Sequence, residues 1–166
     1  MANDAGSLAA QVATLANNGS FDALCRLFAS APVATLTPPL LLEKARAIQL
    51  AEDSAGLTLD DARSSIRQAT MLAPHLPDAW IELGHFYFAV DDDAAQALVA
   101  FHQARACMKP GAVSNDLTLG EAKALVDAGR SSEALALVDK FPAKDASAEL
   151  LQFHKELVEL DARKAR

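Results

Sequence analysis

Apolar positions along this chain recur every three or four residues over most of its length, the spacing of one face of an α-helix. Alternation with period two, typical of a half-buried strand, never persists beyond a few residues. Glycine, proline, asparagine and aspartate interrupt the pattern at intervals and are expected to end or begin helices. We therefore predict an all-α fold. The expected helices cover residues 7–17, 21–30, 39–53, 58–73, 77–90, 94–109, 115–128, 132–140 and 147–164.

Particular residues fix several of the predicted helix ends. Thr58 and Asp61 have the spacing of a capping box, in which each residue satisfies a backbone N–H of the other. Pro77 suits the first turn of a helix, where its missing N–H costs nothing. The run Asp91–Asp93 and Ser114 supply side chains that can accept from free N–H groups at the next two helix starts. Because the connections are short, neighbouring helices should be antiparallel.

One segment carries an ordered set of residue types that repeats in part elsewhere. It reads Trp80, Leu83, Gly84, Tyr87, Ala97, Phe101, Ala104 and Pro110. This order resembles the signature of the tetratricopeptide repeat (TPR) family, W-x2-L-G-x2-Y followed by A-x3-F and a proline, with one extra residue in the acidic turn. The second half of the pattern recurs around Ala62 and Ala134, which lie 35 residues before and 37 residues after Ala97.

The resemblance implies a fold and a division of the chain. It implies a single TPR-like domain over residues 1–166, in which antiparallel helix-turn-helix repeats stack as a right-handed solenoid. The helical pairs are expected at 7–30, 39–73, 77–109 and 115–140, and the helix at 147–164 is expected to cap the last pair. An irregular helical bundle is the competing structural interpretation.

Each residue type of the repeat pattern has an expected role in packing. Gly84 should let the partner helix approach closely, and Ala97 is the small residue expected to face it. Phe101 should insert between repeats. Alanine is abundant while aromatic residues make up only 5% of the chain, so the helices must pack closely to form a core.

The formal net charge of −7 argues against binding to nucleic acids or anionic membranes, which require a basic surface. It is compatible with a basic partner, although most acidic proteins are simply soluble. The N-terminal sequence lacks the basic and apolar regions of a signal peptide, and no stretch is long and apolar enough to span a bilayer. Cys25 and Cys107 stand apart from any CxxC motif and are interpreted as free thiols of a reducing, cytoplasmic compartment.

Motifs that carry chemistry are missing from the sequence. His75, His85, His102 and His154 do not have metal-ligand spacing with one another or with cysteine. No phosphate-binding glycine loop and no GxSxG motif is present. We therefore expect no catalytic residue, no metal site and no cofactor.

In TPR proteins the first helix of each pair lines a concave surface that binds peptides or helices. By repeat phase, the residues expected to face that groove are Asp78, Ile81, His85, Phe88, Asp116, Leu119, Lys123 and Val126. The alternative is that the second apolar stripe of the helix at 77–90 is buried by neighbouring helices on both sides. TPR members that clamp acidic C-terminal tails carry lysine or arginine and asparagine at groove positions. Here Ile81 and His85 occupy the corresponding sites, so that subtype is not expected.

Three functions follow from the resemblance and the charge. The first is a protein-protein interaction module of chaperone or adaptor type, similar to the bacterial secretion chaperones that shield translocator proteins. The second is an immunity or inhibitor protein that neutralises a basic toxin or enzyme by electrostatic attraction. The third is a structural subunit that associates with itself as a homodimer.

Overall fold

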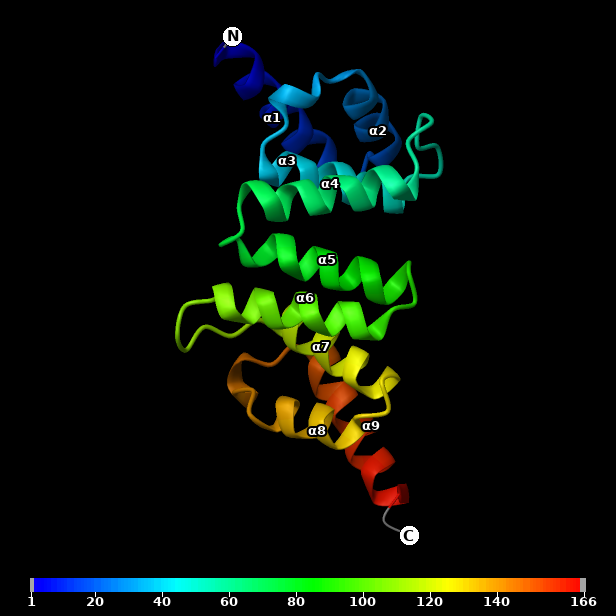
Figure 1. Ribbon diagram of the computed structural model, residues 1–166, viewed down its shortest axis with the longest axis vertical. Coiled ribbons are helices and arrows are strands. Elements are labelled where there is room, and N and C mark those ends of the chain that lie inside the picture. The colour runs from blue at the N-terminus through cyan, green and yellow to red at the C-terminus, as the bar shows by residue number, and fades with distance from the viewer. Residues whose placement is uncertain (1, 165–166) are drawn as a thin grey trace. The chain divides into compact units, whose positions relative to one another are not determined.

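The computed structural model describes residues 2–164, and within that range it contains nine α-helices, two short 3-10 helices and no strand. The all-α prediction is confirmed. The α-helices are α1 (Ala2–Asn17), α2 (Phe21–Ser30), α3 (Pro38–Leu50), α4 (Leu59–Leu72), α5 (Pro77–Ala89), α6 (Ala94–Cys107), α7 (Asn115–Asp127), α8 (Ser131–Asp139) and α9 (Ala148–Lys164) (Figure 1). The 3-10 helices are η1 (Val33–Thr35) and η2 (Ala143–Asp145). The chain divides into two compact units, Met1–His75 and Leu76–Arg166.

The first unit is built around the pair α3 and α4, which pack along each other, with α2 against α3 and α1 against α2. Leu24, Leu41 and Ile66 fill its core, one from each of α2, α3 and α4. Ala62, the repeated alanine of this unit, is fully buried. Small side chains at such positions let the helix axes approach, as the repeat pattern predicts.

Helix starts follow the predicted chemistry. The Thr58 side chain accepts from the Asp61 N–H while the Asp61 carboxylate accepts from the Thr58 N–H, so the capping box before α4 is complete. Asp93 accepts from the Gln96 N–H at the start of α6, and Ser114 accepts from the Leu117 N–H at the start of α7. These side chains satisfy backbone N–H groups in the first turns and so define where the three helices begin.

Two helix boundaries differ from the prediction by three residues or more. The first helix begins at Ala2 and not at residue 7. The third ends at Leu50 and not at residue 53, because the carboxylate of Asp22 accepts from the backbone N–H groups of Glu52 (3.0 Å) and Asp53 (3.2 Å). Those N–H groups are bonded to α2 instead of to carbonyl groups within α3, and the helix stops before them.

The second unit consists of two layers of helices. The pairs α5–α6 and α7–α8 are joined by short turns, and α9 follows α8. Contacts of α5 with α7 and of α7 with α9 place these three helices in one layer, while α6 packs on α5 and α7 and α8 packs on α7 and α9. The repeated alanines Ala97 and Ala134 lie on α6 and α8 and are fully buried.

Phe101 of α6 lies at the centre of the second unit, fully buried between two glycines. A Cβ atom added to Gly84 of α5 would lie 2.5 Å from the Phe101 ring, and one added to Gly120 of α7 would lie 2.7 Å from it. Contacts this short essentially never occur for real Cβ atoms, so the Phe101 ring requires Gly84, and the ring together with His85, also 2.7 Å from such a Cβ, requires Gly120. The predicted roles of Gly84 and Phe101 are confirmed, whereas Gly120 was not recognised from the sequence.

Among the helices that the structure describes, none combines the length and apolar character needed to cross a membrane.

Candidate functional site

The layer of α5, α7 and α9 carries all eight residues expected to contact a partner. On α5 and α7 they follow a spacing of three and four residues, so each set forms one stripe. These are Asp78, Ile81, His85 and Phe88 on α5, and Asp116, Leu119, Lys123 and Val126 on α7. Residues of α9 with the same spacing continue the pattern: Glu149, Phe153, Glu156, Leu160 and Arg163. We name this surface the α5–α7–α9 face.

Two polar contacts join the three stripes side by side. His85 Nε2 lies 2.9 Å from Asp116 Oδ1 and connects α5 to α7. Lys123 Nζ donates to Glu149 Oε1 over 3.0 Å and connects α7 to α9. His85 also stands edge-on to Phe101, with 5.2 Å between ring centroids. The sequence therefore identified residues that the fold brings together, and the contact of Lys123 with α9 extends the face beyond the two predicted stripes.

The predicted residues differ in how much surface they offer. Ile81 and Leu119 are each only 8% exposed, because neighbouring helices cover them, so they support the face from within and offer a partner little contact area. Phe88 and Val126 are half-buried, and Asp78 and Asp116 are exposed. The half-buried apolar side chains are those that a partner could cover further.

A hollow of about 320 Å³ lies on this face between the end of α7 and residues 153–163 of α9. Its apolar lining comes from Val126 of α7 and from Phe153, Leu157 and Leu160 of α9. Its charged rim consists of Glu156, Glu159 and Arg163. An apolar floor with a charged rim is the usual composition of a surface that receives another molecule. From the sequence, α9 was expected only to cap the last helical pair, and the hollow was not predicted.

A second polar cluster connects α6 to α7 in the same unit. Glu121 is buried, with only 6% of its side chain exposed, and its Oε2 accepts from Arg105 Nε (3.1 Å) and Nη2 (2.6 Å). Its Oε1 lies 3.3 Å from His102 Nε2. A buried carboxylate needs such partners to offset the loss of its hydration. The cluster therefore holds α6 and α7 together. Helical periodicity places Glu121 among apolar positions, four residues from both Leu117 and Leu125, and a charged residue at such a position was the available signal.

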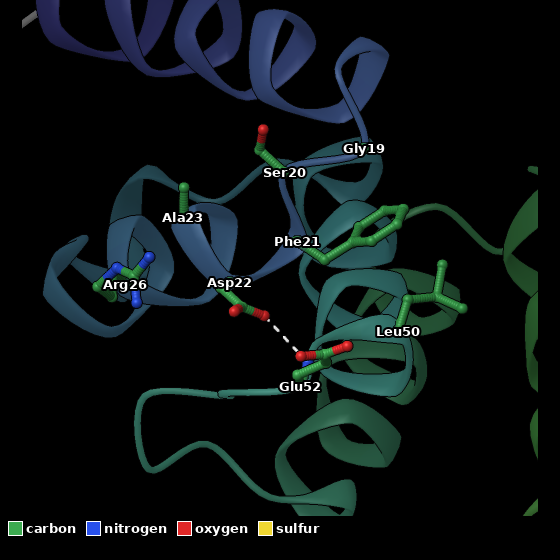
Figure 2. Close-up of a pocket in the computed structure, with 8 residues that line it drawn as sticks. All are labelled: Gly19, Ser20, Phe21, Asp22, Ala23, Arg26, Leu50 and Glu52. Carbon is green, nitrogen blue, oxygen red and sulfur yellow. Dashed lines mark hydrogen bonds between the residues drawn. The ribbon is translucent and has the colours of Figure 1, made fainter.

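The first unit has an open hollow of about 480 Å³ where the turn before α2 meets the end of α3 (Figure 2). Figure 2 shows Asp22 directed toward the backbone N–H of Glu52, the bond that ends α3. Arg26 lies 3.4 Å from Asp53 in an exposed ion pair. Leu50 on its wall is 54% exposed. Asp22 and Arg26 are thus engaged in holding α2 against the segment after α3.

Groups of three or more possible metal ligands are not found among the described side chains. Both cysteines are free thiols. Burial raises the pKa of the Cys25 thiol, and the nearby carboxylates of Asp22 and Asp53 raise it further. Because the thiolate is the reactive form, Cys25 has the character of an inert core residue.

The sequence matches no protein-family profile and no curated protein. The structure is similar to a solved structure of the assembly chaperone of RpL4 (Acl4), residues 1–338, with a TM-score of 0.54 and 17% sequence identity. The match covers 98% of this chain and 60% of that one, so the chain spans less than two thirds of the neighbour's length. The likeness concerns the fold: this chain has an all-α fold of helical pairs, as does a known assembly chaperone.

Proposed function

We propose that this chain is a non-catalytic protein-binding module of chaperone or adaptor type, which receives a segment of a partner protein on the α5–α7–α9 face. The observation that carries the proposal is the hollow between α7 and α9, with its floor of Val126, Phe153, Leu157 and Leu160. A floor of partly exposed apolar side chains gains free energy when another apolar surface covers it.

The likeness to Acl4 supports the same proposal at the level of function class. Acl4 is an assembly chaperone of RpL4, so the fold is known to serve a protein whose task is to assist another protein. We also propose that the chain belongs to the TPR family and acts in the cytoplasm. Fully buried Ala62, Ala97 and Ala134 at the repeated positions support the first point, and the free thiols support the second.

A displayed peptide library tests the proposal without knowledge of the partner. The full chain is immobilised, bound peptides are recovered, and each is measured against Val126→Asp and Val99→Asp. The two variants place the same charge on the same residue type, but Val99 lies on α6 and is 62% exposed. We expect recovered peptides to lose at least about ten-fold in affinity for Val126→Asp and to retain it for Val99→Asp.

Recovery of no peptide above background would contradict the proposal. Equal binding by the two variants would also contradict it, because the α5–α7–α9 face would then have no part in the interaction. Circular dichroism of each variant establishes that the helices remain formed.

A further inference from the structure

The α5–α7–α9 face is acidic, which narrows the kind of segment it can receive. Carboxylates outnumber cations on and around the three stripes. The carboxylates are Asp78, Asp116, Glu149, Glu156 and Glu159, and the cations are Lys123 and Arg163, with His85 able to add a charge. Charge of one sign on a binding surface favours a partner segment of the opposite sign and disfavours one of the same sign.

The cations of the face already have partners. Lys123 donates to Glu149 over 3.0 Å, and Arg163 lies 3.8 Å from Glu159. Both are thereby neutralised in part by carboxylates of α9. These two pairs also engage Glu149 and Glu159, so Asp78, Asp116 and Glu156 are the acidic groups of the face that lie outside them.

Glu156 is the acidic group best placed to act on an occupant of the hollow. It lies on the rim, exposed, and accepts a hydrogen bond from Gln152 Nε2 over 3.0 Å. Within the described part of the chain, no cationic side chain lies within ion-pair distance of it. A lysine or arginine of a bound segment could therefore pair with Glu156 without displacing an existing ion pair.

The apolar floor fixes the second requirement. Phe153 and Leu160 are half-buried and Leu157 is buried, so the floor of the hollow is hydrocarbon. Its volume of about 320 Å³ exceeds that of one large side chain and suits one or two neighbouring apolar residues.

We infer that the hollow between α7 and α9 is an anchor site for a basic-apolar segment of another protein, one in which a large apolar side chain is flanked by lysine or arginine. This inference rests on the proposed function and specifies the partner of that same face. The apolar side chain enters between Val126 and Leu160, and a flanking cation pairs with Glu156 at the rim.

Three fluorescein-labelled peptides test the inference on the full chain by fluorescence anisotropy. The first is Gly-Lys-Lys-Leu-Phe-Lys-Arg-Gly. The second replaces its four basic residues with glutamate, and the third replaces leucine and phenylalanine with serine. We expect only the first to bind, with an affinity that falls several-fold between about 50 mM and about 300 mM NaCl because screening weakens its exposed charge contacts.

Variants of the protein assign the binding to the hollow. Glu156→Lys and Leu160→Asp should each weaken binding of the first peptide about ten-fold or more. Glu52→Lys changes the net charge as Glu156→Lys does, but lies in the first unit, and should leave the affinity within about two-fold. Glu156 is exposed, so its substitution keeps the test valid even if Leu160→Asp perturbs α9.

The outcomes separate this inference from the proposed function. Binding of the glutamate or serine peptide as tightly as the first would overturn it, as would equal effects of Glu156→Lys and Glu52→Lys. If the peptide library yields segments that bind the α5–α7–α9 face but are acidic or lack basic residues, the proposed function stands and this inference is wrong. If the library yields nothing, the proposed function itself fails.

Discussion

His85 of α5 and Asp116 of α7 lie 2.9 Å apart, from Nε2 to Oδ1, although 31 positions separate them in the sequence. The same imidazole stands edge-on to the buried ring of Phe101. His85 therefore makes one contact at the surface of the α5–α7–α9 face and one with the buried packing beneath it. These two contacts should contribute differently to stability.

Substitution of either partner separates the two contributions. Asp116 has 69% of its side chain exposed, so its loss in Asp116→Ala should cost less than about 1 kcal/mol, as exposed ion pairs do. His85→Ala also removes the edge contact with Phe101 and should cost about 1–2 kcal/mol. Urea unfolding of the full chain measures both, and equal costs would contradict the difference in role.

The glycine pair around Phe101 predicts a specific intolerance. Gly120→Ala places a Cβ atom 2.7 Å from both Phe101 Cζ and His85 Cε1, so it should destabilise the chain by about 1–3 kcal/mol although alanine is the better helix former. Thermal or urea unfolding gives the magnitude.

A second substitution checks the cause. Phe101→Leu leaves a smaller side chain between the glycines, and Gly120→Ala in that background should cost at least about 1 kcal/mol less than in the wild type. Additive costs in the double variant would show that the ring is not the reason for the glycine.

The sequence predicted the fold well because most of its determinants are local. Helical periodicity, the capping box of Thr58 and Asp61 and the alanine at position 97 each depend on neighbours within a few residues or on a repeated pattern. The early end of α3 depends instead on Asp22, some thirty residues away in the sequence. No local pattern contains that information.

The candidate site was predicted in part for the same reason. Repeat phase placed His85, Asp116, Lys123 and Val126 on one face, and the fold brings them together. Burial of Ile81 agrees with the alternative that neighbouring helices cover the second apolar stripe of its helix, whereas burial of Leu119 was not predicted, since the pattern of one helix does not reveal what its neighbours bury. The hollow arises from the packing of α9 beside α7, a tertiary contact that the pattern of α9 alone does not contain.

The buried carboxylate of Glu121 predicts a strong dependence on Arg105. Arg105→Met keeps an apolar stem of similar length but removes the two hydrogen bonds to Glu121, and it should cost about 2–4 kcal/mol at neutral pH. Arg26→Met, which breaks the exposed pair with Asp53, should cost less than about 1 kcal/mol. Equal losses on urea unfolding would contradict a structural role for the buried pair.

The capping box before α4 predicts a dependence on pH. The backbone N–H of Thr58, and then its hydroxyl, donate to the Asp61 carboxylate and hold the pKa of Asp61 below its ordinary value. In the unfolded chain the pKa of an aspartate is about 3.9. The charged cap therefore stabilises the folded chain above that pH, and its contribution is lost as the pH falls through the lower folded-state pKa.

The measurement is a comparison of wild type with Asp61→Asn. The wild type should be the more stable at pH 7, and the difference should shrink as the pH falls below about 4. A difference that stays constant over this range would mean that the charge of Asp61 does not contribute to the cap.

The most direct test of the central claim is amide chemical-shift mapping of the full chain with a peptide recovered from the library. We predict shift changes concentrated on the α5–α7–α9 face, at Phe88, Lys123, Val126, Glu156 and Leu160, with the amides around Val99 of α6 unchanged. Changes confined to α6 and α8, or to the first unit, would contradict the assignment of partner binding to this face.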